Sequence, residues 1–161
     1  MCGITGYVGT GDGVSIVETT LKNLEYRGYD SAGVAINNDS MEVFKREGRI
    51  EELEIPSQKA KTAIGHTRWS THGEPNDRNA HPHTDCSGDV AVVHNGIIDN
   101  YETLKSELLD SHIFESDTDT EVIPHLIEEE LQTGSSLLKA VSTVFEKLSG
   151  SFALAVSHVD H

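Results

Sequence analysis

The sequence Met1-Cys2-Gly3-Ile4-Thr5-Gly6-Tyr7-Val8 opens the chain, and it decides how the rest is interpreted. An initiator methionine is normally removed when a small residue follows it, so we expect the mature chain to begin at Cys2. Cys2 would then carry a thiol and a free α-amino group. An α-amino group in a model peptide titrates near pH ~8, so it can act as a base for the side chain of its own residue. The alternative is that Cys2 is simply a small buried apolar residue.

Composition limits the class of protein. The chain has 161 residues and a formal net charge of -15, from 12 Lys and Arg against 27 Asp and Glu. This length corresponds to one domain, or most of one. So acidic a surface argues against nucleic acid and anionic membranes as partners, because both require basic residues. With two cysteines, no secretory signal pattern and no long apolar run, we expect a cytoplasmic protein.

Hydrophobic periodicity predicts a mixture of strands and helices. Strands are expected near residues 4–8, 34–37, 41–45, 63–67, 89–94 and 151–157. Helices are expected near residues 13–25, 101–110, 120–132 and 136–148. The order shows no regular alternation of strand and helix, so the fold class is α+β and not a doubly wound parallel sheet.

Glycine and polar residues predict where the chain turns. Residues 26–33 are expected to form a turn, and Asn95-Gly96 is typical of a tight hairpin turn. Residues 68–88 form a long polar stretch, and a loop of that length in a compact domain is usually functional or disordered. Thr118 and Glu121 have the spacing of a capping box, and Pro124 should kink the following helix or shift its start.

Several polar residues stand directly after predicted strands or turns, where they could reach a shared cleft. Arg68 could bind a carboxylate through two parallel hydrogen bonds. Asn95 and Gly96 could donate an amide and a backbone N–H to an oxyanion. Asp119 could pair with an ammonium group. Each has an ordinary alternative: a surface ion pair for Arg68, a plain turn for Asn95-Gly96 and a helix N-cap for Asp119.

The histidines are candidate metal ligands. Five of them lie within thirty residues, with a cysteine among them: His66, His72, His81, His83, His94 and Cys86. Their spacings match no recognised zinc pattern, and there is no Cys-x-x-Cys. A serine triad is also disfavoured, because no Gly-x-Ser-x-Gly is present. We therefore expect no metal and no cofactor.

Seven motifs, in order along the chain, resemble one family: Cys2-Gly3-Ile4, Arg27-Gly28-Tyr29-Asp30-Ser31-Ala32-Gly33, His66-Thr67-Arg68-Trp69, Thr71-His72-Gly73-Glu74-Pro75, Asn79-Ala80-His81-Pro82-His83, His94-Asn95-Gly96-Ile97-Ile98 and Asp117-Thr118-Asp119-Thr120-Glu121. The chain resembles the glutaminase domains of isomerising glutamine–fructose-6-phosphate aminotransferases. The related glutaminase of amidophosphoribosyltransferases typically differs after Arg27-Gly28 and at Trp69, so it is the second choice.

The resemblance implies a fold, a reaction and a set of site residues. The fold would be the N-terminal-nucleophile (Ntn) hydrolase αββα sandwich of two antiparallel sheets. The reaction would be hydrolysis of L-glutamine to glutamate and ammonia through a γ-glutamyl thioester, with the ammonia used for amino sugar biosynthesis. The family's roles make Cys2, Asn95 and Gly96 catalytic, with Arg27 supporting the nucleophile loop. The implied substrate-binding residues are Arg68, Trp69, Thr71, His72, His81 and Asp119.

The chain is shorter than the domain it resembles. We expect residues 2–161 to form a glutaminase domain that lacks its C-terminal part, with the sugar-phosphate isomerase domain absent. Sheet edges left without neighbours would favour association, including homo-oligomers. The alternative is therefore a non-catalytic fragment that binds glutamine or a partner chain.

Overall fold

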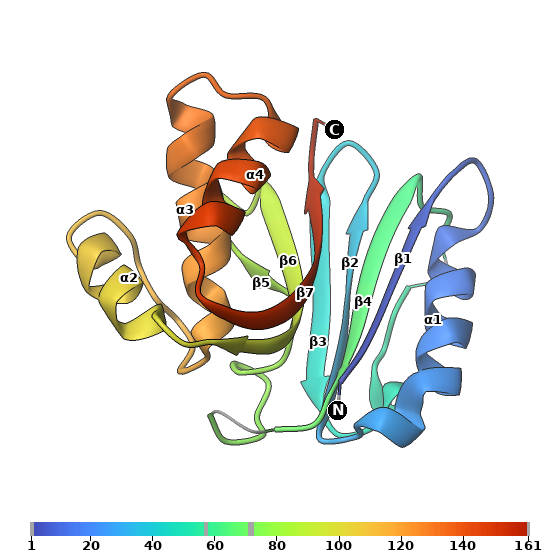
Figure 1. Ribbon diagram of the computed structural model, residues 1–161. Coiled ribbons are helices and arrows are strands. Elements are labelled where there is room, and N and C mark those ends of the chain that lie inside the picture. Colours follow the sequence, from blue (N-terminus) through green and yellow to red (C-terminus); the bar gives the residue numbers. More distant parts are fainter. Residues whose placement is uncertain (1, 57, 71–72, 161) are drawn as a thin grey trace.

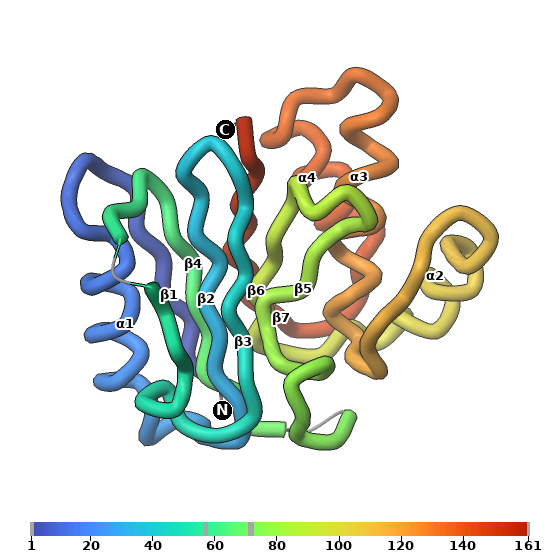
Figure 2. Tube along the Cα trace, turned by 180° about the vertical axis from the view of Figure 1, so that it is seen from behind, coloured from blue at the N-terminus to red at the C-terminus, as the bar shows by residue number. Residues whose placement is uncertain are grey.

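The computed structural model describes residues 2–56, 58–70 and 73–160. They form two antiparallel sheets packed face to face, with helices on both outer sides (Figure 1). Seen from behind in Figure 2, the same layers appear, with α1 (Gly13–Leu24) outside one sheet and α3 (Val122–Gln132) and α4 (Leu137–Lys147) outside the other. This is an αββα sandwich of two antiparallel sheets, so the α+β prediction is confirmed.

The first sheet has four strands in the order β1-β4-β2-β3. Their bounds are β1 Gly3–Val8, β2 Ser31–Asn37, β3 Met41–Glu47 and β4 Thr62–Arg68. Alternate residues of β2 face opposite sides of the sheet. Ala32, Val34 and Ile36 pack with α1 in one buried cluster, whereas Ala35 belongs to the cluster between the sheets.

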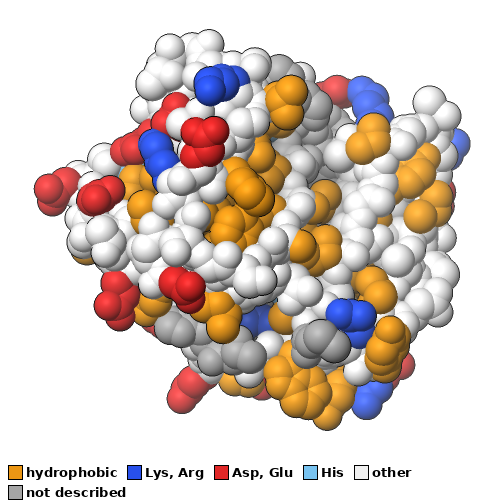
Figure 3. Space-filling model, in the orientation of Figure 1, with side chains coloured by type: hydrophobic (Ala, Val, Ile, Leu, Met, Phe, Trp, Pro, Cys, Tyr) orange, Lys and Arg blue, Asp and Glu red, His pale blue; other side chains and the backbone are white. Residues whose placement is uncertain are grey.

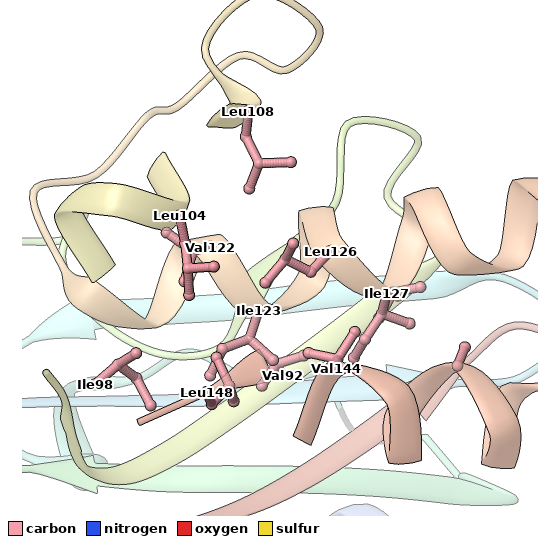
Figure 4. Packing of buried hydrophobic residues seen from close by; sticks show 12 residues of the cluster. Val92, Ile98, Leu104, Leu108, Val122, Ile123, Leu126, Ile127, Val144 and Leu148 are labelled. Atoms are coloured by element: carbon pink, nitrogen blue, oxygen red, sulfur yellow. The ribbon is translucent and has the colours of Figure 1, made fainter. Parts of the chain in front are cut away.

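The second sheet has three strands in the order β5-β6-β7, with bounds β5 His83–Thr84, β6 Val90–Ile98 and β7 Gly150–His158. Its outer face carries the largest hydrophobic cluster, to which α3 contributes Ile123 and Ile127, and β6 contributes Val92. Figure 4 shows these side chains converging with Leu104 and Leu108 of α2 (Tyr101–Leu108).

A third, smaller cluster joins the two sheets. Ala35 and Ile64 of the first sheet pack against Ala91 and Val93 of the second. One side-chain amide also spans the layers: Asn37 Nδ2 donates to the carbonyl oxygens of His158 at 2.7 Å and Val159 at 3.3 Å. The sheets are thereby fixed relative to each other, which matters because the candidate site lies between their ends.

Two turn predictions were wrong. Ser31 to Gly33 were expected in a turn but lie in β2, where they pair with both β3 and β4. Asn95-Gly96 was expected to be a hairpin turn, yet β6 continues through it and pairs with β7, with Asn95 opposite Ala153. Gly96 has φ +148°, and a Cβ there would lie 2.1 Å from the Ser151 carbonyl oxygen. Close strand contact, and not turn formation, explains this glycine.

The start of α3 also differs from the prediction. Thr118 makes no capping hydrogen bond. The Glu121 carboxylate instead accepts the backbone N–H groups of Glu115 and Ser116, both at 2.7 Å. A short 3-10 helix, η3 (Asp119–Glu121), precedes α3, so Pro124 lies in the first turn of α3, where it is tolerated. Pro124 therefore shifts the helix start and does not interrupt it.

Strand β7 is an edge of its sheet within the part of the chain that the structure describes, and its residues are less buried than those of β6. Figure 3 shows the molecule in the orientation of Figure 1. Hydrophobic side chains gather in the middle of this view, where Figure 1 places α4 and β7. Phe145 of α4 is exposed, and its ring packs edge-on against Phe152 of β7 at a centroid distance of 4.9 Å.

Candidate active site

Cys2 stands at the end of β1, beside the end of β4. The two strands are antiparallel with Gly3 opposite Thr67, so Cys2 is carried to the residues that follow Arg68. The Trp69 N–H donates to Cys2 Sγ at 3.4 Å, and the Cys2 thiol lies 3.7 Å from the Trp69 carbonyl oxygen. Arg27 Nε donates to the Cys2 carbonyl oxygen at 3.2 Å. Cys2 is a free thiol and half-buried.

Two glycines of the sequence motifs let the backbone close around Cys2. A Cβ on Gly28 would lie 2.5–2.7 Å from the Arg68–Trp69 peptide. A Cβ on Gly3 would lie 2.7 Å from Thr67 Oγ1 and 2.8 Å from Leu24 Cβ. Side chains at either position would push Cys2 away from Trp69, so packing requires both glycines.

The turn after α1 fixes the segment that holds Arg68. Asp30 donates its backbone N–H to the Arg68 carbonyl oxygen at 3.0 Å, and its carboxylate accepts the Ser70 N–H at 2.8 Å. The Arg68 side chain is buried and donates to the Gly73 carbonyl oxygen at 3.3 Å. Burial lowers the pKa of Arg68, and nearby acidic groups oppose that shift. The guanidinium remains a cation at neutral pH.

Asp119 brings a buried carboxylate to the same place from η3. Its Oδ2 accepts the Ile98 N–H at 2.8 Å, and its Oδ1 lies 4.0 Å from His94 Nδ1. The Thr120 hydroxyl lies 2.7 Å from the same His94 nitrogen. Burial lowers the pKa of His94 although the Asp119 carboxylate opposes the shift, so His94 is neutral at pH 7.

These groups surround one hollow of about 20 Å³, which has room for about one water molecule. It is lined by Cys2, Arg68, Trp69, His81, His94, Gly96, Thr118, Asp119 and Thr120. A thiol, a cation and a carboxylate therefore face a common space, with Arg68 and Asp119 offering opposite charges. A substrate larger than water requires the walls to move apart, and Trp69 is 46 % exposed at the rim.

Behind the hollow lies a row of neutral histidines. The His81 ring lies between those of His66 and His83, tilted against the first and edge-on to the second, with centroids 4.2 and 4.8 Å away. His66 Nε2 lies 2.9 Å from the His94 carbonyl oxygen, which links β4 to β6 across the sheets. Burial lowers the pKa of His66 to about 3, and it also lowers the pKa values of His81 and His83. These rings add polar atoms without adding positive charge.

Most of the residues expected at the site come together. The hollow is lined by Cys2, Gly96, Arg68, Trp69, His81 and Asp119, and Arg27 contacts Cys2 from outside it. Asn95 is adjacent in β6 but is not among the lining residues. Thr71 and His72 lie outside the described residues.

Sequence reasoning missed three lining residues, His94, Thr118 and Thr120. The position of His94 could have been predicted. Residues two apart on a strand lie on the same face, and Gly96, two residues after His94, was already a candidate. The misassigned turn at Asn95-Gly96 concealed that relation. Thr118 and Thr120 flank Asp119, with Thr118 directly before η3 and Thr120 within it, and the sequence gives no period that distinguishes them.

Comparison with known proteins decides the family. The sequence profile described as "Glutamine amidotransferase domain" matches residues 66–161, more than half of the chain. The chain belongs to this family. It is 60 % identical over 163 residues to a glutamine–fructose-6-phosphate aminotransferase (isomerizing) of Halobacterium salinarum, and 52 % identical over 166 residues to one of Thermococcus kodakarensis. These alignments cover 100 % and 99 % of this chain, but 27 % and 28 % of the relatives.

Two solved structures share the fold of this chain. A glutamine phosphoribosylpyrophosphate amidotransferase from B. subtilis, complexed with ADP and GMP, superposes with a TM-score of 0.81 at 28 % identity. It covers 96 % of this chain, which corresponds to 35 % of that chain. A second structure, of the allosteric regulatory enzyme of purine biosynthesis, superposes with a TM-score of 0.78 at 26 % identity. The match covers 95 % of this chain and 34 % of that one.

Two further facts bear on organisation. The chain spans about a quarter of the length of the curated relatives it matches. Among the residues that the structure describes, none of the helices is long and apolar enough to cross a membrane.

Proposed function

We propose that this chain hydrolyses L-glutamine to glutamate and ammonia, with Cys2 as nucleophile and its α-amino group as proton carrier. One observation carries the proposal: the Cys2 thiol, the Arg68 guanidinium and the Asp119 carboxylate line the same hollow. Amino-acid recognition needs one cation and one anion near each other, and this hollow supplies both beside a thiol.

Glutamine would bind by its zwitterionic end. Arg68 would hold the α-carboxylate, a task that suits a guanidinium because two parallel hydrogen bonds fix orientation. Asp119 would hold the α-ammonium. Thr71, His72 and His81 are proposed to complete the binding site, and Trp69 to shape the wall beside Cys2.

The reaction would proceed in two halves. The Cys2 amine takes the thiol proton as sulfur attacks the side-chain amide carbon, and the resulting oxyanion collapses to expel ammonia with that proton. This leaves a γ-glutamyl thioester on Cys2. The amine then takes a proton from water, hydroxide attacks the thioester, and glutamate leaves as the thiol recovers its proton.

Oxyanion stabilisation is assigned to the Gly96 N–H and the Asn95 amide. Gly96 lines the hollow, which supports its role. Asn95 does not, so its role requires that its amide turn toward Cys2 when glutamine opens the hollow.

The use of the ammonia is proposed from relatives. Those named glutamine–fructose-6-phosphate aminotransferase are about four times longer than this chain and act, by that name, on glutamine and fructose 6-phosphate. We propose that residues 2–161 are the glutaminase part of such an enzyme, acting in the cytoplasm beside a sugar-phosphate isomerase domain that takes up the ammonia. The glutaminase of an amidophosphoribosyltransferase is less well supported, because the aminotransferase relatives reach 60 % identity whereas the phosphoribosylpyrophosphate amidotransferase structure shares 28 %.

The test measures ammonia release from glutamine by the protein that carries this chain, after intact-mass measurement shows whether Met1 has been removed. Cys2→Ala should lower turnover by at least ~10³-fold, as loss of a nucleophile does in other hydrolases. An electrophilic glutamine analogue should alkylate Cys2 and leave Cys86, the second free thiol, unmodified. Unchanged turnover in Cys2→Ala would refute the mechanism, and glutamine binding without turnover would favour a non-catalytic fragment.

A further inference from the structure

Four side chains from three separate segments converge away from the active-site hollow. Cys86 lies in the turn between β5 and β6, His112 lies after α2, and His125 and Glu128 lie on α3. Each presents one potential metal-ligating atom, and the four atoms all lie within 4.8 Å of one another. Both histidines are buried, whereas Cys86 is exposed.

The spacing of these atoms fits a tetrahedral ion. Zinc binds sulfur at ~2.3 Å and nitrogen or oxygen at ~2.0–2.2 Å, so neighbouring ligand atoms in a tetrahedron are roughly 3.3–3.6 Å apart. Cys86 Sγ lies 3.6 Å from His112 Nδ1 and 3.7 Å from His125 Nδ1. Glu128 Oε2 lies 3.2 Å from His112 Nδ1 and 3.8 Å from His125 Nδ1. These distances leave a central point close to all four atoms.

We propose that Cys86, His112, His125 and Glu128 bind a divalent transition-metal ion of the zinc class. Thiolate, imidazole and carboxylate are the ligands that such ions select. A thiolate and a carboxylate also neutralise the two positive charges of the ion, so a site with two buried histidines carries no net charge when loaded. With four protein ligands the coordination is closed, which is characteristic of structural and not catalytic zinc.

A carboxylate lies near the second nitrogen of each imidazole ring. Glu129 Oε1 lies 3.4 Å from His112 Nε2, and Glu121 Oε1 lies 4.0 Å from His125 Nε2. Metal-bound histidines commonly direct their second nitrogen toward a carboxylate, which fixes the ring and raises its basicity. In both rings, Nδ1 faces the proposed ion and Nε2 faces away from it. The 3.4 Å contact with Glu129 supports the orientation of His112, whereas His125 Nε2 is buried and has no hydrogen-bond partner among the described residues.

A metal ion could reach the cluster from solvent. A cavity of about 290 Å³ is lined in part by Cys86 and His125, so an ion can reach the cluster without passing through the core. None of the four ligands lines the hollow that contains Cys2. The proposal is therefore independent of the proposed glutaminase activity.

The ion would add a link between segments that the hydrophobic cluster around α2 and α3 already holds together. It would tie the β5–β6 turn to the segment after α2 and to α3, so we assign it a stabilising role. This departs from the expectation of no metal. That expectation considered Cys86 with His66, His72, His81, His83 and His94, whereas the fold brings Cys86 to two other histidines.

The test begins with metal content. The protein carrying this chain, purified without chelator, should contain one zinc-class ion per chain by elemental mass spectrometry. After chelator stripping, stoichiometric Co²⁺ should produce a thiolate-to-cobalt charge-transfer band and the visible bands of a four-coordinate site. Zn²⁺ should displace Co²⁺ and raise the melting temperature of the stripped protein, because a ligand that binds only the folded state stabilises it.

Variants separate this site from other thiols and histidines. Cys86→Ser should abolish the charge-transfer band, and Cys2→Ser should leave it intact. His112→Asn should weaken Zn²⁺ binding by at least ~100-fold, and Glu129→Gln by about 10-fold, the lower end for an outer partner. His158→Asn serves as the histidine control and should bind as the parent does.

The wild-type Co²⁺ spectrum keeps the test decisive even if a variant misfolds. Absence of a thiolate band at stoichiometric Co²⁺ in folded, stripped protein would show a hydrogen-bonded cluster without an ion, and would overturn the proposal. A band that survives Cys86→Ser, or disappears in Cys2→Ser, would overturn it as well.

Discussion

The Cys2 thiol is held mainly by backbone groups. Cys2 Sγ interacts with the N–H and carbonyl of Trp69, and the Cys2 carbonyl oxygen accepts from Arg27. Such contacts depend on close backbone approach, which Gly3 and Gly28 permit. At the residue scale, the position of Cys2 therefore depends on the absence of side chains at Gly3 and Gly28.

Asp119→Asn tests recognition of the substrate ammonium. The new amide oxygen can still accept the Ile98 N–H, which now lies 2.8 Å from Oδ2, so the fold should persist. Loss of the negative charge should raise KM for glutamine by about 10- to 100-fold, since a hydrogen bond to a charged group contributes about 1.5–3 kcal/mol. Steady-state kinetics provides the measurement, with kcat expected to change less than KM.

Asp117→Asn is the matched control, because Asp117 is exposed and pairs with Arg78 outside the hollow. Equal effects of the two variants on KM would contradict the assigned role of Asp119.

At the scale of elements, strand β6 connects the core to the site. Its first half, Val90 to Val93, is buried between the sheets and the helices, whereas Gly96 reaches the hollow. Pairing with β7, whose residues come more than fifty positions later, keeps β6 extended through Asn95-Gly96. The fold thus overrides a strong local turn signal with a long-range strand pairing.

Gly33→Ala should destabilise the first sheet. A Cβ on Gly33 would lie 2.1 Å from the His81 carbonyl oxygen and 2.7 Å from Lys45 Cβ. Because backbone must move to relieve this overlap, we expect a loss of about 1–3 kcal/mol in the free energy of unfolding. Urea denaturation measures it. Gly6→Ala in β1 is the control, since its nearest contact would be 3.8 Å, and a comparable loss there would argue against the steric cause.

At the scale of the whole molecule, the sandwich encloses ionisable groups in their neutral form. His66, His81 and His83 are buried, and burial lowers the pKa of each. In the unfolded chain a histidine titrates near pH ~6.5. Below that pH the unfolded chain binds protons that the folded protein does not, so folding stability decreases as pH falls.

The free energy of unfolding should therefore decrease between pH 6.5 and 5, above the range where most carboxylates titrate. Each buried histidine contributes at most about 1.4 kcal/mol per pH unit. For His66 the loss would continue to its folded pKa of about 3. Urea denaturation with chelator present measures the slope without interference from metal binding, and His66→Gln should reduce that slope. Titration of the His66 ring by NMR near pH 6.5 in the folded protein would contradict the prediction.

The sequence by itself determined the order of the elements and most of the site. Periodicity located the helices and strands because their hydrophobic faces are local properties of the chain. The motifs at Cys2, Arg68, Gly96 and Asp119 predicted that these residues lie at one site, and the structure brings the four to one hollow.

Only the tertiary structure decided the features that depend on distant pairing. It kept Asn95-Gly96 in a strand because β7 pairs with it, and it assigned Gly3 and Gly28 to packing. It also brought His112 and His125 to Cys86. The two histidines are 26 and 39 positions from Cys86, so no sequence period joins them to it. Only His125 and Glu128 are close in sequence, three residues apart on one face of a helix.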